Sequence, residues 1–355
     1  MKKLIAMLLV LIMVTAVFAG CGEKDSGEMY IPVLAKGFQH QFWQTVEKGS
    51  KAAAEDLGVK IYFVGPESES DIDVQVDQFK QELGKNPDAI ALAALSTEAV
   101  KELLQQCADN NIPVIGFDSG VPGDASGALK ATASTNNQAA AAIAAEKFGA
   151  HEGLVAAMKA ATKENPVRIA CLSQDATSES VTGRTTGFVN KMYEEASKHG
   201  TVAVVGHDTW KKGNEADASI IIEVGIAATP DVVDVQNTAN MLLAKEDLIA
   251  VFCSNEGAVT GFLAAVSGGT DLADGGKYAD LVVAGFDAGK AQKDAVRAGY
   301  FYGSVTQDPY RIGYLAVELA FKAAKGETVE NADTGAKWYD ASNIDADDIK
   351  DLVYD

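Results

Sequence analysis

Short apolar runs alternate with amphipathic segments along most of the chain, and this alternation limits the possible folds more than any other feature. The run at 30–36, YIPVLAK, precedes a segment at 41–57 in which apolar residues recur at the spacing of one helix face. The same order continues with apolar runs at 59–65, 89–95, 113–118 and 128–134 and helical segments at 71–83, 98–110 and 136–148. Such runs are typical of strands buried on both faces, so the pattern predicts parallel β-sheet covered by helices on both sides.

The pattern starts again near residue 150, with apolar runs at 168–173, 201–208, 248–254, 281–287 and 302–307 and helical segments at 179–198 and 309–325. A chain of 355 residues is long for one core and suits two domains. We therefore expect an α/β protein of two doubly wound parallel-sheet lobes with right-handed crossovers. Three segments are less regular. We interpret 209–230 as an insertion between a strand and its helix, 267–276 as a surface loop, and 340–355 as a late strand with surface turns.

The first twenty residues have the layout of a secretory signal peptide. Lys2 and Lys3 precede an uncharged apolar run at 4–18, and small residues lead to Cys21. A transmembrane anchor is the alternative, but the run is short for a bilayer span of about 20 residues. The ending Ala-Gly-Cys resembles the lipobox of bacterial lipoproteins, although Phe18 stands where leucine is usual. This resemblance implies a lipidated Cys21, a linker at 21–28 and an extracytoplasmic protein, either held at the outer face of the cell membrane or periplasmic.

Composition and charge exclude several classes of function. The net charge of −20 argues against a nucleic-acid partner, because neutralising phosphates needs a basic surface. Beyond Cys21 there are three cysteines, with no C-x-x-C pair, and no two histidines stand four residues apart. The sequence therefore predicts neither a disulfide framework nor a metal site, and it contains no phosphate-binding or nucleophile-elbow motif that would imply a cofactor or a catalytic serine.

Polar residues follow the predicted strands in both halves. Ligands of open parallel sheets bind outside the carboxyl ends of the strands, so these positions are candidates for binding. They are Lys36, Asp118, Ser134 and Asn136 in the first half, and Gln174, Asp175, Asn255, Asp287 and Gln307 in the second. Asp118 and Asp287 both end a Gly-Phe-Asp tripeptide, at 116–118 and 285–287. A strand-end aspartate can instead cap a helix, but its recurrence in the same context favours a role in binding.

The stretch KGFQHQFW at 36–43 places two aromatic residues at the start of the first helix. Flat aromatic rings suit the C–H faces of a sugar ring, whereas carboxylate, amide and guanidinium groups pair with its hydroxyls. Phe42 also falls on the apolar face of this helix and can serve the core alone. Trp43 lies about a hundred degrees away around the helix and is the better candidate for stacking.

The segment from Tyr30 to about Lys325 resembles the sugar-binding proteins of bacterial ABC importers of the ribose-binding type, which have the type I periplasmic binding protein fold. The resemblance is carried, in order, by KGFQHQFW (36–43), IPVIGFD (112–118), RTTGF (184–188), VFCSNE (251–256), VVAGFD (282–287) and TQDPYRIGY (306–314). It implies that Phe42 and Trp43 sandwich a sugar ring, and that Asp118, Arg184 and Asp287 bind its oxygens and hydroxyls. It also implies polar contacts from Asn255 and Gln307 near the hinge, and a place for Ser134 in the cleft.

Lys36 and His40 stand where the family more often has serine and asparagine, and LAAL at 92–95 lacks its usual polar residue. Both Lys36 and His40 are expected to donate to the ligand. These departures leave open a neutral sugar, a sugar acid, a phosphosugar or an unusual polyol.

We expect an extracytoplasmic solute-binding protein, acting as a monomer without a cofactor, that closes over a monosaccharide and delivers it to an ABC permease with its ATPase. The resemblance implies a first lobe of 29–134 plus 308–335 and a second of 135–307 plus 336–355. The hinge crossings are expected near 118–135, 285–289 and 305–309. Two alternatives are a sensory module that docks on a chemoreceptor or histidine kinase and, more remotely, a glycosidase using paired carboxylates.

Overall fold

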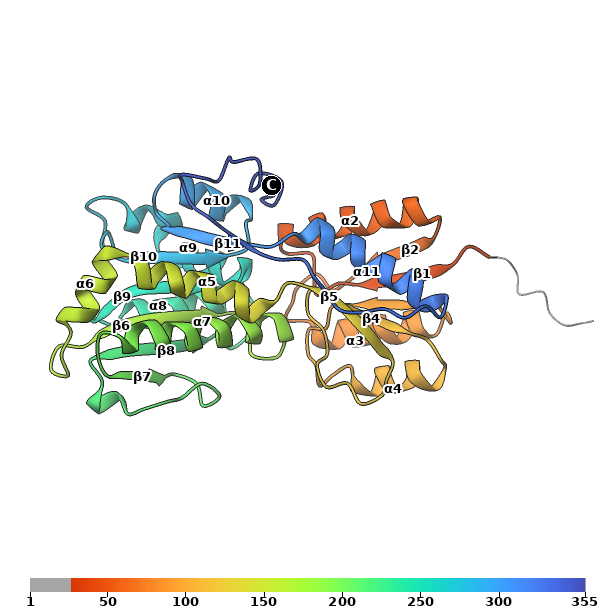
Figure 1. The fold of residues 1–355 in the computed structure, drawn as a ribbon, viewed down its shortest axis with the longest axis horizontal. Helices are drawn as coiled ribbons and strands as arrows, with labels where there is room; N and C mark the ends of the chain where they lie inside the picture. The colour runs from red at the N-terminus through yellow and green to blue at the C-terminus, as the bar shows by residue number, and fades with distance from the viewer. Residues whose placement is uncertain (1–26, 355) are drawn as a thin grey trace, which may run out of the picture.

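The computed structural model describes residues 27–354, which form two α/β lobes lying side by side along the long axis of the molecule (Figure 1). The predicted signal peptide, and Cys21 with most of its linker, lie outside the described residues. Within 27–354, no helix combines the length and the apolar character needed to cross a membrane.

The first lobe is built on a six-stranded parallel sheet in the order β12-β5-β4-β3-β1-β2. Its strands are β1 Tyr30–Leu34, β2 Lys60–Val64, β3 Ile90–Leu92, β4 Val114–Phe117, β5 Leu129–Ser134 and β12 Ala332–Asp333. Its helices are α2 Gln41–Leu57, α3 Ile72–Leu83, α4 Lys101–Asp109 and α11 Pro309–Ala324. Helices α2 and α11 pack very closely, since a Cβ at Gly49 would lie 1.9 Å from the carbonyl oxygen of Tyr310.

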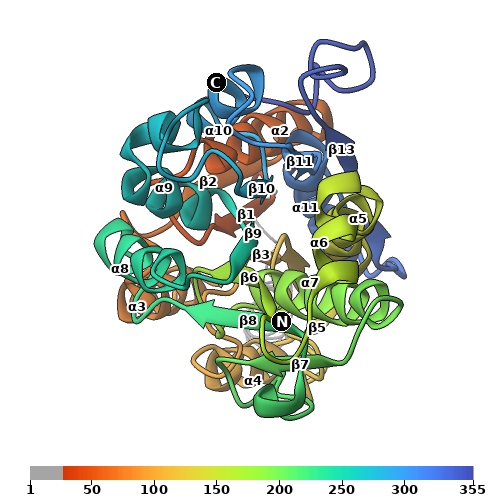
Figure 2. The same ribbon diagram turned by 90° about the vertical axis from the view of Figure 1, so that its left-hand side faces the viewer.

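The second lobe is built on a seven-stranded sheet in the order β13-β11-β10-β9-β6-β8-β7, parallel except for β13. Its strands are β6 Val167–Ser173, β7 Val202–Val205, β8 Ile220–Ile226, β9 Leu248–Cys253, β10 Val282–Phe286, β11 Gly303–Thr306 and β13 Lys337–Tyr339. Its helices are α5 Asn137–Ala150, α6 Glu152–Ala160, α7 Glu179–Ser197, α8 Val232–Leu243, α9 Glu256–Ala265 and α10 Lys290–Arg297. Figure 2 shows α5, α6 and α7 on one side of this sheet and α8 and α9 on the other. The predicted fold class of two doubly wound lobes is confirmed.

The interpretation of 209–230 as an insertion is wrong. Residues 220–226, IIIEVGI, form β8, which lies inside the sheet between β6 and β7 and pairs with both. This run is mostly buried, as expected for an internal strand. The glycine-rich stretch at 267–276 also has more structure than a loop, since Ser267–Leu272 forms a 3₁₀ helix interrupted at two glycines.

The chain passes between the two sheets three times, at 134–137, 306–309 and 333–337. The predicted crossing at 285–289 is wrong, because β10 and the neighbouring β11 both belong to the second sheet. The third passage instead follows β12, whose two residues pair with the end of β5. Hydrogen bonds join the first and third passages, among them those from the amide of Thr334 to the carbonyl of Ser134 and from the hydroxyl of Thr135 to the carbonyl of Gly335.

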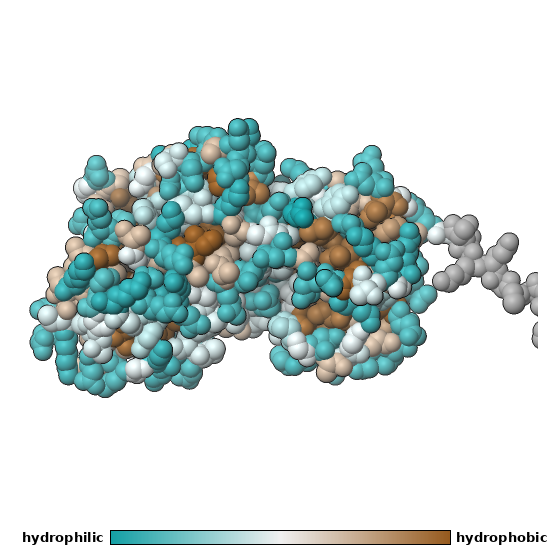
Figure 3. All heavy atoms as spheres, in the orientation of Figure 1, coloured by the Kyte–Doolittle hydropathy of each residue, from teal (hydrophilic) through white to brown (hydrophobic). Residues whose placement is uncertain are grey.

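The surface is largely hydrophilic on the face seen in Figure 3, with apolar patches scattered over both lobes. Cys107, Cys171 and Cys253 are free and buried, which confirms that Cys171 and Cys253 act as small core residues. The C-terminal segment at 340–355 is less exposed than predicted, because Ile344, Ile349 and Tyr354 are all buried.

Candidate functional site

A narrow cavity lies between the lobes, at the carboxyl ends of strands from both sheets. This is where the topology of parallel sheets places a ligand. Its walls are made by Lys36, His40, Phe42, Trp43, Glu69, Asp118, Arg184, Asn255, Glu256, Asp287 and Gln307. Nine of the ten residues expected to contact the ligand thus meet around one cavity, whereas the further strand-end candidates Asn136, Gln174 and Asp175 do not line it.

The two Gly-Phe-Asp aspartates occupy equivalent positions in the two lobes. Asp118 follows β4 with φ 53° and Asp287 follows β10 with φ 77°, in the left-handed region that aspartate adopts more readily than most residues. Each peptide carbonyl accepts a hydrogen bond from a serine of the adjacent strand, Ser134 Oγ at 2.6 Å and Ser304 Oγ at 3.0 Å. The backbone therefore fixes both carboxylates at the cavity wall.

Ser134, the tenth predicted residue, does not line this cavity. Its hydroxyl faces the backbone of Asp118, and the residue borders a separate surface hollow at the hinge. Its place at the end of β5 follows the strand-end rule, but that hydrogen bond gives it a positioning role.

Arg184, on α7, joins the two aspartates across the lobes. Its guanidinium lies 3.4 Å from the carboxylate of Asp287 and 3.7 Å from that of Asp118. Its Nε donates to Asn137 Oδ1 at 2.9 Å, and the guanidinium carbon lies 4.0 Å from the ring centroid of Phe286. This planar cation is held by several partners and is only 3% exposed, so its orientation is fixed in the closed form.

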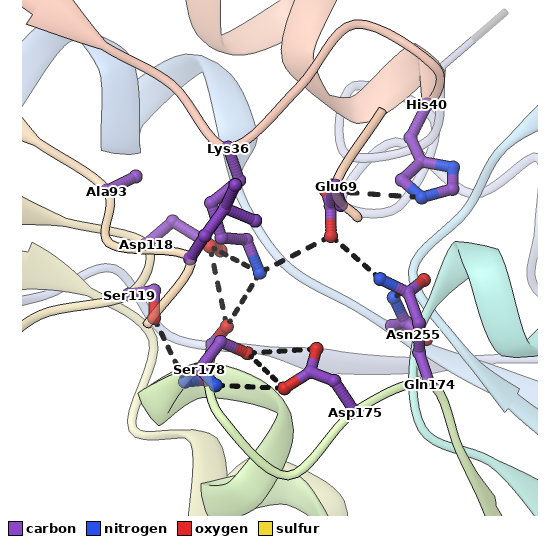
Figure 4. Close-up of polar contacts among 12 residues, drawn as sticks. Lys36, His40, Glu69, Ala93, Asp118, Ser119, Gln174, Asp175, Ser178 and Asn255 are labelled. Atoms are coloured by element: carbon purple, nitrogen blue, oxygen red, sulfur yellow. Dashed lines mark hydrogen bonds and ion pairs between the residues drawn. The ribbon is translucent and has the colours of Figure 1, made fainter. Parts of the chain in front are cut away.

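Lys36 and His40 meet a carboxylate that the sequence reasoning missed, that of Glu69 (Figure 4). Lys36 Nζ lies 3.7 Å from Glu69 Oε2 and 3.7 Å from Asp118 Oδ2, and His40 Nε2 lies 4.0 Å from Glu69 Oε1. Burial raises the pKa of Glu69, but Lys36, His40 and two hydrogen bonds outweigh it and lower this pKa to about 2. Burial likewise raises the pKa of Asp118 above its ordinary value, although Lys36 and Arg184 oppose it.

The Glu69 loop approaches Lys36 closely because the next residue is glycine. A Cβ at Gly37 would lie 3.1 Å from Glu69 Cγ. Glu69 follows β2 in the segment GPESES, so the strand-end rule applied to β2 would have identified it.

Both predicted aromatic residues face the cavity, from the first turn of α2. Their rings contact edge to face with centroids 5.0 Å apart. Trp43 is 1% exposed, and its Nε1–H donates to Glu69 Oε1 at 2.8 Å. The tryptophan therefore has a fixed orientation, in which its ring is available as a flat wall.

Asn255, Gln307 and the unpredicted Glu256 complete the wall in the second lobe. Asn255 caps α9 by accepting from the amide of Ala258 at 3.0 Å, and its side-chain amide donates to Gln174 Oε1 at 2.7 Å. Gln307 Nε2 donates to Asp287 Oδ1 at 2.8 Å, while its buried Oε1 has no partner within the described residues. An unpartnered buried acceptor at a cavity wall marks a place for a ligand donor.

Direct hydrogen bonds join the lobes on both sides of the cavity. Gln174 Nε2 donates to Glu69 Oε2 at 2.8 Å, and the Glu256 carboxylate accepts from the amides of Gln41 and Phe42 at 3.2 and 3.3 Å. These contacts show that the lobes are closed on each other.

Within residues 27–354, no group of three or more His, Cys, Asp or Glu side chains is placed to hold a metal ion. The carboxylates at the cavity are instead paired with cations and amides.

Comparison with known proteins agrees with this architecture. The profile of a family described as "Periplasmic binding protein domain" matches residues 31–328. A search of curated proteins gave no match. Among solved structures, a Brachyspira murdochii protein titled "ABC transporter, LacI family transcriptional regulator" is 44% identical, with a TM-score of 0.76, covering 93% of this chain and 100% of that one.

Two further solved structures carry a bound sugar. An ABC transporter solute-binding protein from Agrobacterium vitis with D-fucose is 27% identical, with a TM-score of 0.74, covering 92% of this chain and 100% of that one. A carbohydrate transporter solute-binding protein from Agrobacterium radiobacter in complex with D-arabinose is 27% identical, also with a TM-score of 0.74, covering 93% of this chain and 100% of that one. Two lobes, a three-segment hinge and a family match over most of the chain lead to one assignment: the protein belongs to the periplasmic binding protein domain family, with the type I fold of the ribose-binding type.

Proposed function

We propose that this protein captures a monosaccharide between its two lobes outside the cytoplasm and delivers it to an ABC permease with its ATPase. The observation that carries the proposal is the cavity at the strand ends, where two aromatic rings, two aspartates and an arginine from both lobes converge. Rings offer flat apolar faces, and the charged and amide groups offer paired hydrogen bonds, which is the combination a sugar ring requires. The sugars bound by the Agrobacterium relatives support the same ligand class.

The proposed site residues are the nine predicted ones at the cavity together with Glu69 and Glu256. We further propose that binding draws the lobes together by rotation about the three hinge passages, as in other two-lobed binding proteins. Lipidation of Cys21 would hold the monomeric protein at the outer face of the membrane.

A thermal-shift screen of the purified chain lacking residues 1–20 tests the ligand class. We expect at least one pentose or hexose to raise the melting temperature, and the variant Asp118→Asn to lose that rise. Asp274→Asn, at an exposed loop position, is the matched control and should keep it. Failure of every monosaccharide to shift the melting temperature would overturn the proposal.

Import is tested in cells that lack the gene. We expect such cells to lose uptake of the radiolabelled sugar identified in the screen, and uptake to return with the gene on a plasmid. Retained uptake together with a lost chemotactic or transcriptional response to the sugar would favour the sensory role instead. Turnover of aryl glycosides that Asp118→Asn abolishes would favour a glycosidase.

A further inference from the structure

Lys36 is the feature that most suggests an anionic ligand, because a buried ammonium at a cavity wall is a natural partner for a carboxylate or phosphate. The structure gives this ammonium two internal partners, since Nζ lies 3.7 Å from both Glu69 and Asp118 and 3.3 Å from Ser180 Oγ. The side chains of Lys36, Glu69 and Asp118 are all buried. The positive charge is therefore balanced inside the protein before a ligand enters.

In the closed form, Arg184 is balanced between Asp287 of its own lobe and Asp118 of the other. Four carboxylates line the cavity, those of Glu69, Asp118, Glu256 and Asp287, against the two permanent cations Lys36 and Arg184. Burial favours protonation of Asp118 and Glu256, whose pKa values are both raised. Each cation has a carboxylate partner other than these two, which is Glu69 for Lys36 and Asp287 for Arg184.

The remaining hydrogen-bonding capacity of the wall suits hydroxyl groups. Gln307 Oε1 is a buried acceptor without a partner within the described residues, and the nearest donors to the carboxylate of Asp118 stand at 3.5 Å or more. Lys36 and Arg184 still have N–H groups held only at long distances. A sugar hydroxyl both donates and accepts, so it can satisfy groups of both kinds. A carboxylate or phosphate can satisfy only the donors, and would stand desolvated beside the carboxylates.

We propose that the cavity takes a monosaccharide without negative charge and excludes sugar acids and phosphosugars, because Glu69 neutralises Lys36. This inference rests on the proposed sugar-binding function. We assign Glu69 as a specificity-determining residue. Because Glu69 balances the charge of Lys36, the ammonium can still donate hydrogen bonds to hydroxyls but no longer attracts an anion.

Isothermal titration at pH 7.5 with matched pairs of probes tests this assignment. The pairs are D-galactose with D-galacturonate and D-glucose with D-glucose 6-phosphate, supplemented by D-arabinose and D-fucose. We expect the wild-type protein to bind uncharged probes at least a hundredfold more tightly than either anionic probe. In Glu69→Gln the ratio of the two affinities should fall at least tenfold, because Lys36 then keeps only Asp118 as a carboxylate partner, and burial raises the pKa of Asp118.

Two variants separate charge balance from loss of structure. Glu67→Gln removes a carboxylate from an exposed position in the same loop and should leave the ratio unchanged. The double variant Lys36→Gln/Glu69→Gln restores neutrality and should recover discrimination relative to Glu69→Gln alone. This comparison remains informative if the single variant has lost stability.

The outcomes of these titrations are distinct. An anionic probe that binds the wild type as tightly as its uncharged partner would overturn the inference but leave the sugar-binding function standing. A ratio within twofold of wild type in a folded Glu69→Gln would overturn the role of Glu69. If neither charged nor uncharged sugars bind, the proposed function itself has failed.

Discussion

Two helices at the lobe interface receive their N-terminal caps from the opposite lobe. His40, at the N-cap of α2, makes no capping hydrogen bond with its side chain, and Glu256 of the second lobe accepts from the first two amides of α2 instead. Gly289, at the N-cap of α10, has no side chain to offer, and Gln41 of the first lobe accepts from the amide of Lys290 at 2.7 Å. Both contacts exist only when the lobes are together, so they stabilise the closed form.

Gln41→Ala isolates this contribution, because Gln41 is not among the residues lining the cavity. Removing a capping side chain costs about 1 kcal/mol. Because a tenfold change in affinity corresponds to about 1.4 kcal/mol, we expect the sugar dissociation constant to rise about fivefold. The melting temperature of the sugar-free protein should change little if the lobes open freely, since an amide at an exposed helix terminus can bind water instead.

Isothermal titration with the sugar from the thermal-shift screen measures the effect, and small-angle scattering reports closure. Gln44→Ala is the matched control, because Gln44 is exposed on the same helix. A dissociation constant of Gln41→Ala within twofold of wild type would refute the idea that cross-lobe capping favours the closed form. A fivefold loss in Gln44→Ala as well would show that the effect comes from the helix and not from the contact.

Three further predictions concern the aspartates and Glu69. Ser134→Ala removes the hydrogen bond to the Asp118 carbonyl, so it should weaken sugar binding and lower the free energy of unfolding by about 1 kcal/mol in denaturant titration. If neither the sugar affinity nor the free energy of unfolding changes, Ser134 does not position Asp118. Asp118→Asn and Asp118→Ala should both lose sugar binding, and the alanine variant should melt at a lower temperature than the asparagine variant, since asparagine tolerates the positive φ of this residue; equal melting temperatures of the two variants would show that the backbone stores no strain. The lowered pKa of Glu69 means that its stabilising effect is complete above its ordinary value of 4.5 and is lost as the pH falls towards 2. The stability difference between wild type and Glu69→Gln, followed by thermal melts from pH 8 to 3, should therefore shrink below pH 4.5, and a difference independent of pH would contradict the ion pairing.

The rule that ligands bind at strand ends accounts for most of what could be predicted from the sequence. It located Lys36, Asp118 and Asp287 because their strands are apolar on both faces and end sharply. It missed Glu69 because this residue lies five residues beyond the end of β2, whereas Lys36, Asp118 and Asp287 follow their strands within two residues. Lys36 and Glu69 lie 33 residues apart in the sequence. Their pairing therefore depends on how the two loops that carry them fold.

The errors in the fold have a similar physical origin. Strand β8 follows a polar stretch that holds a short 3₁₀ helix, Glu215–Asp217. The polar stretch and the strand together lack a single periodicity, so the segment resembles an insertion. The third hinge passage follows β12, which has only two residues and no apolar run to mark it. Short pairings of this kind are made by tertiary contacts and leave no periodic signal in the sequence.

The repeated Gly-Phe-Asp tripeptide explains how two lobes of different size make one symmetric site. In each lobe the aspartate leaves its strand with a positive φ, and a serine on the next strand holds its carbonyl. A non-glycine residue in that region is destabilising by itself, so its occurrence at both equivalent positions indicates that the carboxylate direction matters more than local stability. Arg184 then contacts one aspartate from each lobe, so the cation that we propose as a ligand contact also links closure to the geometry of both carboxylates. Any ligand that replaces these long contacts with shorter hydrogen bonds must therefore favour the closed form, because only closure brings the three groups together.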